Sequence, residues 1–173
     1  MELQNFEQLF WTYKARFWLD TSCMITIRKA EQADIPSLAY LLGLLFEQEK
    51  EFSADFMRQK IGLEMIISDP AIGEVLVAER PDKGVVGMVS LLFTVSTAIG
   101  GRAALLEDMV VAPDERGHGC GSSLVAAAID LARERECKRI TLLTDFDDLA
   151  AEKFYQKHGF KLSPMVPLRQ LID

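Results

Sequence analysis

The chain has 173 residues, 49% of them hydrophobic and 26% charged, which is typical of one globular domain with a sizeable core and excludes disordered and fibrous classes. Its formal net charge of −7 disfavours nucleic acid and anionic membranes as partners, because both attract a cationic surface. A cationic substrate fits this charge better.

The cysteines and apolar runs give no sign of export or metal binding. Cys23, Cys120 and Cys137 are an odd number without CxxC spacing or a histidine cluster, so we predict neither a disulfide framework nor a zinc site. No apolar run approaches the ~20 residues that span a bilayer. Glu7 and Lys14 interrupt the first stretch where a signal peptide would stay apolar. We therefore expect a cytoplasmic protein without a metal.

The first 23 residues predict an aromatic-rich helical extension ahead of a domain spanning 24–173. Apolar residues recur there at steps of three and four, the pattern of an amphipathic helix, and Trp11 and Trp18 add a second apolar face. Two apolar faces favour packing on the domain and on a second subunit, hence a homodimer. A helix that only covers the core, or a segment upstream of a natural start at Met24, remains an alternative.

Residues 24–111 predict a strand, two helices and three more strands. The run 24–30 alternates as a strand, Ile35 and Pro36 open a helix, and a second amphipathic helix covers 56–67. Strands at 75–79 and 85–93 flank a turn at 81–84, and a further strand covers 103–111. We expect three neighbouring antiparallel strands here.

After Pro113 the pattern changes to a glycine cluster, a helix at 122–135, an apolar strand at 139–144 and a helix at 149–158. A helix that crosses over between two strands returns the chain in the same direction, so these strands should pair in parallel. The predicted class is mixed α/β, with antiparallel strands first, then a parallel pair, and helices flanking the sheet.

The glycine cluster has the features of a phosphate-binding loop. Glycines permit positive φ and let consecutive N–H groups point into one concavity. A helix N-terminus directly behind them favours anions, and an arginine in front adds a forked cation. We predict a pyrophosphate cradle formed by Arg116, Gly117, His118, Gly119, Cys120, Gly121 and Ser122.

Two other phosphate loops fit less well. A nucleoside triphosphatase loop needs GxxxxGK followed by Ser or Thr, and no such lysine follows these glycines. A dinucleotide-binding fold needs GxGxxG, whereas the spacing here is GxGxG. A merely tight turn would explain one or two glycines but gives no reason for Arg116.

Arg116, Gly119 and Gly121 match a signature of Arg or Gln followed by xxGxG or xxGxA. In this respect the sequence resembles the GCN5-related N-acetyltransferase (GNAT) superfamily, from IRKAEQADIPSL at 27–38 through FYQKHGF at 154–160. The resemblance implies a sheet whose parallel pair splays apart, acetyl-CoA as co-substrate, and direct acetyl transfer to a primary amine in a ternary complex.

The resemblance also implies roles for single residues. Main-chain groups of Met109, Val110 and Val111 would contact the pantetheine arm, and Tyr155 would protonate the departing thiolate. Asp148 stands where many members carry an asparagine that contacts the coenzyme. A carboxylate there would repel phosphate, and capping of the next helix is the interpretation we prefer.

The amine must attack as a free base, so a proton acceptor is needed. Glu107, within the tripeptide LED, is similar to a glutamate of diamine acetyltransferases in this superfamily and is the candidate. A structural role for Glu107, with a water chain as the base, carries equal weight. Strand alternation would place Asp108 on the opposite face. His118 and Cys120 occupy variable positions of the loop, and we assign neither a catalytic role.

The acceptor is predicted from charge alone. Acidic residues in the connection after the first helix would attract a polyamine, an aminoglycoside or a lysine-like amine, although such runs are more often solvated faces. They are Glu47, Glu49, Glu51 and Asp55. The alternatives are acetylation of a protein N-terminus or lysine, and a non-catalytic module that senses acyl-CoA.

Overall fold

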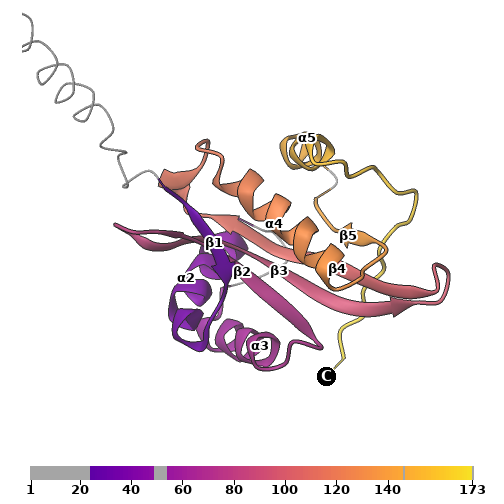
Figure 1. Cartoon of the computed structure of the whole chain (residues 1–173), viewed down its shortest axis with the longest axis horizontal. Helices are drawn as coiled ribbons and strands as arrows, with labels where there is room; N and C mark the ends of the chain where they lie inside the picture. The colour runs from indigo at the N-terminus through magenta and orange to yellow at the C-terminus, as the bar shows by residue number, and fades with distance from the viewer. Residues whose placement is uncertain (1–23, 49–53, 146, 173) are drawn as a thin grey trace, which may run out of the picture.

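The structure is a computed structural model that describes residues 24–48, 54–145 and 147–172 (Figure 1). The helix expected over residues 1–23 lies outside the described residues, as do Cys23, Glu49 and Glu51. The described residues form one five-stranded sheet with helices on both faces (Figure 1).

The strands follow one another across the sheet in chain order. The first four pair antiparallel, and the last two pair in parallel. This arrangement confirms the predicted mixed α/β class. The strands are β1 (Thr26–Lys29), β2 (Gly73–Arg80), β3 (Gly84–Ser96), β4 (Gly101–Val111) and β5 (Ile140–Leu142).

Helices cover the two faces of the sheet separately (Figure 1). The helices α2 (Ile35–Phe46) and α3 (Phe56–Ser68) pack on one face, and α4 (Cys120–Glu134) and α5 (Leu149–Lys157) lie over the other. Two short 3₁₀ turns, η3 (Gln32–Asp34) and η4 (Pro113–Glu115), precede α2 and follow β4. The four predicted helices within the described residues are therefore confirmed.

The helix α4 has a strongly one-sided sequence that explains its place in the core. Cys120, Leu124, Ala128 and Leu131 recur at helical spacing and are all buried against the sheet. Leu124 is completely buried. A Cβ atom added to Gly87 of β3 would lie only 3.2 Å from Leu124 Cδ1. Glycine at position 87 therefore lets α4 lie close to the sheet.

The strand β4 is irregular in the middle. Its register with β3 shifts between Met88 and Ser90, and Asp108 has a φ of 47°. Leu106 and Met109 consequently pack in the same cluster although they are three residues apart. The alternation that predicted opposite faces for Glu107 and Asp108 therefore does not apply here, because the bulge interrupts it.

The two parallel strands separate early. Only Ala104–Leu106 of β4 pair with Ile140–Leu142 of β5. Beyond Leu106, the edge of β4 that faces β5 has no strand partner among the described residues. This edge is open to a ligand, although the main-chain oxygens of Glu107 and Val111 already accept hydrogen bonds from the side chains of Ser90 and Arg116.

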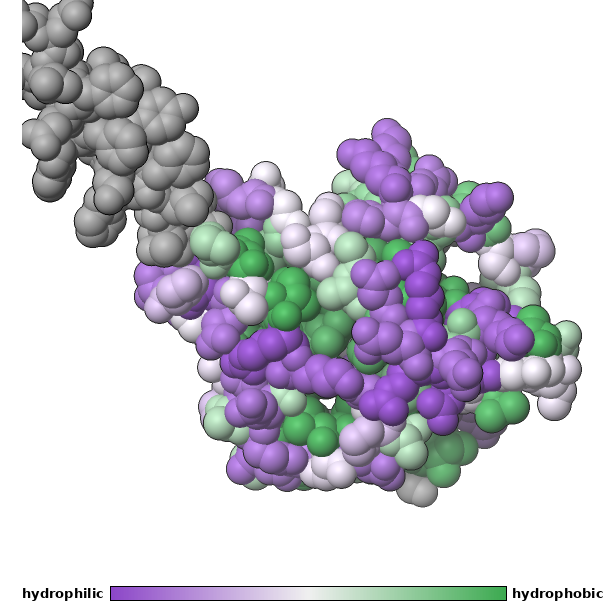
Figure 2. All heavy atoms as spheres, in the orientation of Figure 1, coloured by the Kyte–Doolittle hydropathy of each residue, from purple (hydrophilic) through white to green (hydrophobic). Residues whose placement is uncertain are grey.

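Part of the surface is apolar. Figure 2 shows hydrophobic side chains along the lower edge of the view, where α3 and the C-terminal residues lie. Met57 and Met65 on α3 and Leu171 and Ile172 near the C-terminus are all exposed. The homodimer that was predicted from residues 1–23 stays a prediction. Within the described residues, no helix is long and apolar enough to cross a bilayer.

Replacement of Leu124 by Ala should lower the free energy of unfolding by about 2–5 kcal/mol, because a fully buried leucine leaves a cavity. Chemical denaturation of the purified chain measures this. Leu162, which is 74% exposed, offers the same substitution outside the core and should change stability by less than about 0.5 kcal/mol. Equal effects of L124A and L162A would contradict the packing assigned to α4.

Candidate functional site

The loop between β4 and α4 requires glycine for its backbone conformation. Gly117 and Gly119 have φ values of 80° and 86°. A Cβ at either position would meet nothing within 4 Å, so the requirement is conformational and not steric. In this left-handed region other residues lose roughly 1–2 kcal/mol. Gly119 is the residue at which α4 begins, and it turns the chain into the helix.

The main-chain amides of this loop are unpaired. In the described part of the chain, the N–H groups of residues 117–122 donate to no protein acceptor, and the first amide that does is Ser123, which donates to Gly119 O at 3.0 Å. No side chain caps α4. Unpaired amides at the positive end of a 15-residue helix are a ready site for an anion.

Arg116 lies at the entrance to these amides. Its side chain is exposed, and its Nε donates to the main-chain oxygen of Val111 at 3.0 Å. This contact folds the guanidinium back toward the end of β4. Among residues 24–48, 54–145 and 147–172, no carboxylate forms an ion pair with Arg116. Its charge is therefore available to an anionic ligand.

Three elements meet at the first turn of α4. A Cβ on Gly121 would lie 3.1 Å from Met109 Cε of β4 and 3.5 Å from Phe154 Cζ of α5. His158, the residue directly after α5, places Nε2 3.3 Å from Ser122 Oγ. Glycine at position 121 thus permits a close approach of α4, β4 and α5 beside the unpaired amides.

Tyr155 reaches the open edge of β4. Its hydroxyl donates to Met109 Sδ at 3.5 Å, and its ring packs edge-on against Phe154 and Phe160. Burial raises the pKa of Tyr155 above its usual value of about 10, and the nearby charge of Asp148 adds to the effect. The phenol is therefore protonated at neutral pH, and its partner, a thioether sulfur, is a weak acceptor.

Asp148 begins α5. One carboxylate oxygen accepts hydrogen bonds from Ala150 N at 3.1 Å and Ala151 N at 2.9 Å. These are the bonds of an N-cap, so the capping interpretation is confirmed. A contact between Asp148 and the coenzyme stays a prediction.

Glu107 is a half-buried residue. Its main-chain oxygen accepts from Ser90 Oγ at 3.1 Å, and the same hydroxyl lies 3.4 Å from Asp108 Oδ2. The carboxylate of Glu107 itself forms no hydrogen bond or ion pair within the described residues. It is thus available as a proton acceptor, but no contact links it to Tyr155.

The cysteines and the acidic segment supply little chemistry. Cys120 is buried, and burial raises the pKa of its thiol, which disfavours the reactive thiolate. Asp55, one of the acidic residues proposed to attract an amine, caps α3 and pairs with Arg58. Glu47 is exposed at the end of α2. No group of three or more potential ligands in the described residues could hold a metal ion.

Sequence reasoning missed several residues of this site. Phe154 lies on α5 and His158 caps its C-terminal end four residues later, a spacing that keeps the two rings together and could have indicated their contact with the first turn of α4. The positive φ of Asp108 had no local signal, although aspartate tolerates this conformation better than most residues.

Comparisons with known proteins agree with this geometry. A family model described as "Acetyltransferase (GNAT) family" matches residues 36–160. Glucosamine 6-phosphate N-acetyltransferase of Trypanosoma brucei brucei is 28% identical over 143 residues, covering 79% of this chain and 89% of that protein. Thialysine N-epsilon-acetyltransferase of Bos taurus is 30% identical over 125 residues, covering 68% and 73%.

A solved structure supports the fold. The crystal structure of glucosamine-6-phosphate N-acetyltransferase from Arabidopsis thaliana superposes with a TM-score of 0.69 at 22% identity, covering 87% of this chain and 99% of that chain. At this level of identity the likeness shows a shared fold.

Replacement of Asp148 by Ala should lower the free energy of unfolding by about 0.5–2 kcal/mol, because two amides of α5 lose their acceptor. Replacement by Asn keeps an oxygen acceptor and should leave stability nearly unchanged. Denaturant unfolding of D148A and D148N measures the difference. If D148N loses as much stability as D148A, charge and not capping explains the role of Asp148.

Proposed function

Because this chain belongs to the acetyltransferase (GNAT) family and is an acetyltransferase, we propose that it moves an acetyl group from acetyl-CoA to a primary amine of a small molecule. The observation that carries the proposal is the run of unpaired amides at residues 117–122 with Arg116 beside them. Together they match the diphosphate of coenzyme A in charge and in hydrogen bonding.

The open edge of β4 supports a place for the rest of the coenzyme. Among the described residues the edge of β4 beyond Leu106 has no strand on the side of β5, which supports pairing of main-chain groups of Met109, Val110 and Val111 with the amides of the pantetheine arm. The oxygen of Val111 would have to give up its hydrogen bond from Arg116 Nε to take part. This edge begins next to the loop and runs past Tyr155. We propose that the thioester lies near the phenol.

Acetyl transfer requires that the amine lose one proton and that the departing sulfur gain one. The nitrogen of a neutral amine attacks the thioester carbonyl carbon, the C–S bond breaks, and the amine loses a proton while the sulfur gains one. We assign Glu107 as the proton acceptor because the residue is half-buried and its carboxylate is unpaired within the described residues. We assign Tyr155 as the donor because its phenol stays protonated and bonds only weakly to Met109.

The substrate class rests on the relatives and on charge. The two curated relatives are named for glucosamine 6-phosphate and thialysine, both of which carry primary amines. A net charge of −7 favours a cationic acceptor. Family membership favours this enzyme over a module that only senses acyl-CoA, and a peptide acceptor remains the alternative.

Calorimetry with coenzyme A and release of free thiol from acetyl-CoA test the proposal. We expect the full chain to bind coenzyme A and to release thiol with at least one small amine from a panel of glucosamine 6-phosphate, thialysine, spermidine and aminoglycosides. A folded chain that does not bind coenzyme A would refute the proposal. Turnover only with a lysine peptide would favour the alternative.

Replacement of Tyr155 by Phe should lower kcat about 100-fold and leave the KM for acetyl-CoA nearly unchanged, because only the proton donor is lost. Thiol release under saturating conditions measures this. Tyr40, which is 65% exposed on α2, provides the matched control, and Y40F should have wild-type kcat. Equal turnover of Y155F and Y40F would remove Tyr155 from the mechanism.

Replacement of Glu107 by Gln should lower kcat/KM for the amine about 100-fold near neutral pH, and less at high pH, where more of the amine is already deprotonated. A pH profile of the thiol release measures the effect. Glu134, exposed near the end of α4, offers the control E134Q with unchanged activity. Wild-type turnover of E107Q at neutral pH would favour a water chain as the base.

A further inference from the structure

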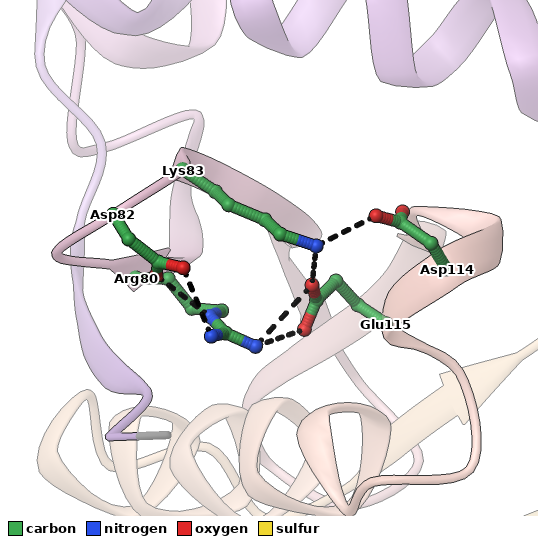
Figure 3. Close-up of polar contacts among 5 residues, drawn as sticks. All are labelled: Arg80, Asp82, Lys83, Asp114 and Glu115. Carbon is green, nitrogen blue, oxygen red and sulfur yellow. Dashed lines mark hydrogen bonds and ion pairs between the residues drawn. The ribbon is translucent and has the colours of Figure 1, made fainter. Parts of the chain in front are cut away.

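A cluster of five charged residues lies next to the phosphate loop (Figure 3). Arg80 is the last residue of β2, Asp82 and Lys83 lie in the turn between β2 and β3, and Asp114 and Glu115 belong to η4. The two segments are more than 30 residues apart in sequence and are held together by these side chains. Arg116 follows η4 directly.

Glu115 is the centre of the cluster. Its side chain is only 3% exposed, and it accepts hydrogen bonds from Arg80 Nη1 at 3.0 Å and Lys83 Nζ at 2.6 Å (Figure 3). Lys83 also contacts Asp114 at 2.7 Å, and Arg80 Nε contacts Asp82 at 3.0 Å. Both cations therefore form ion pairs with a carboxylate that has almost no access to water.

These contacts keep Glu115 charged. A carboxylate with this little exposure would lose much of its hydration, and it stays ionised only when it is paired. The hydrogen bond from Lys83 lowers the pKa of Glu115, and the contact with Arg80 lowers it further. At neutral pH a full negative charge thus lies one residue before Arg116.

Two adjacent residues of opposite charge have separate partners. Glu115 faces Arg80 and Lys83, whereas Arg116 contacts the main-chain oxygen of Val111. Without Arg80 and Lys83 as partners, the carboxylate of Glu115 would be left to pair with its sequence neighbour Arg116. It would also repel any anion that approaches the amides of residues 117–122.

We propose that Arg80 and Lys83 are positioning residues that hold Glu115 as internal counter-charges, so that Arg116 and the amides of 117–122 remain available to the coenzyme diphosphate. The inference rests on the proposed function, since that function supplies the anion. In this arrangement Arg80 and Lys83 act through Glu115 and do not themselves contact the ligand.

Removal of both cations should weaken coenzyme binding, and removal of Glu115 should then restore it. We expect R80Q/K83Q to raise the Kd of the full chain for coenzyme A about 10-fold or more, and R80Q/K83Q/E115Q to return it to within about threefold of wild type. Calorimetry gives the Kd values. In thiol release, the KM for acetyl-CoA should follow the same order while kcat stays constant.

Two controls separate this effect from general charge and from folding. R133Q/K60Q removes two positive charges from exposed ion pairs elsewhere and should leave the Kd unchanged. If R80Q/K83Q fails to fold, Lys83, which is 41% exposed, can be replaced alone, and K83Q is then compared with K83Q/E115Q. Thermal unfolding of each variant verifies folding.

The outcomes are distinct. A wild-type chain without affinity for coenzyme A refutes the proposed function itself. If the wild type binds and R80Q/K83Q binds equally well, the positioning role is wrong. If the triple variant binds as weakly as R80Q/K83Q, the cations act on the ligand directly or through the fold, and the role assigned to Glu115 is also wrong. Only loss followed by rescue supports the inference.

Discussion

The early separation of β5 from β4 is the constraint on which the rest of the site depends. Because the strands pair only at Ala104–Leu106, no strand of the described residues lies along one edge of the following part of β4, and Met109 contacts Tyr155 there. The loop after this strand ends in main-chain N–H groups that donate to no protein acceptor within the described residues. An open strand edge and an uncapped helix N-terminus would both be unfavourable in a purely structural element, and both suit a ligand with amides and phosphates.

Charge in this region is arranged by contacts between distant parts of the chain. The end of β2 and the turn after it supply one cation each, Arg80 and Lys83, to η4, and η4 precedes the arginine of the loop. A protein with a net charge of −7 must keep its carboxylates away from a phosphate site, and pairing them locally achieves this. Such pairing would let an acidic chain that binds the proposed cationic acceptor also bind the proposed anionic co-substrate.

Much of the fold could be predicted from sequence because periodicity and turn residues act locally. The helix predicted at 122–135 begins two residues earlier, since Gly119 in the left-handed region already starts it. The strand predicted at 139–144 shortens to Ile140–Leu142, because pairing with β4 ends there. The glycine loop and Tyr155 were also singled out from sequence, and their roles stay predictions. The contact between Glu115 and Lys83 and the contact between Tyr155 and Met109 were not predicted. They join residues 32 and 46 positions apart, and a single sequence carries no direct signal of such contacts.

The bulge at Asp108 limits how this protein can diversify. Its positive φ excludes β-branched residues and favours glycine, asparagine and aspartate, so sequence drift there is confined to a small set of residues. The inserted residue also changes the phase of β4, so that Leu106 and Met109 share a face although their odd separation would place them apart in a regular strand. A descendant that lost the bulge would have to move the thioether of Met109 or the carboxylate of Glu107 to the other side of the strand, and the geometry that we propose for proton exchange would be lost.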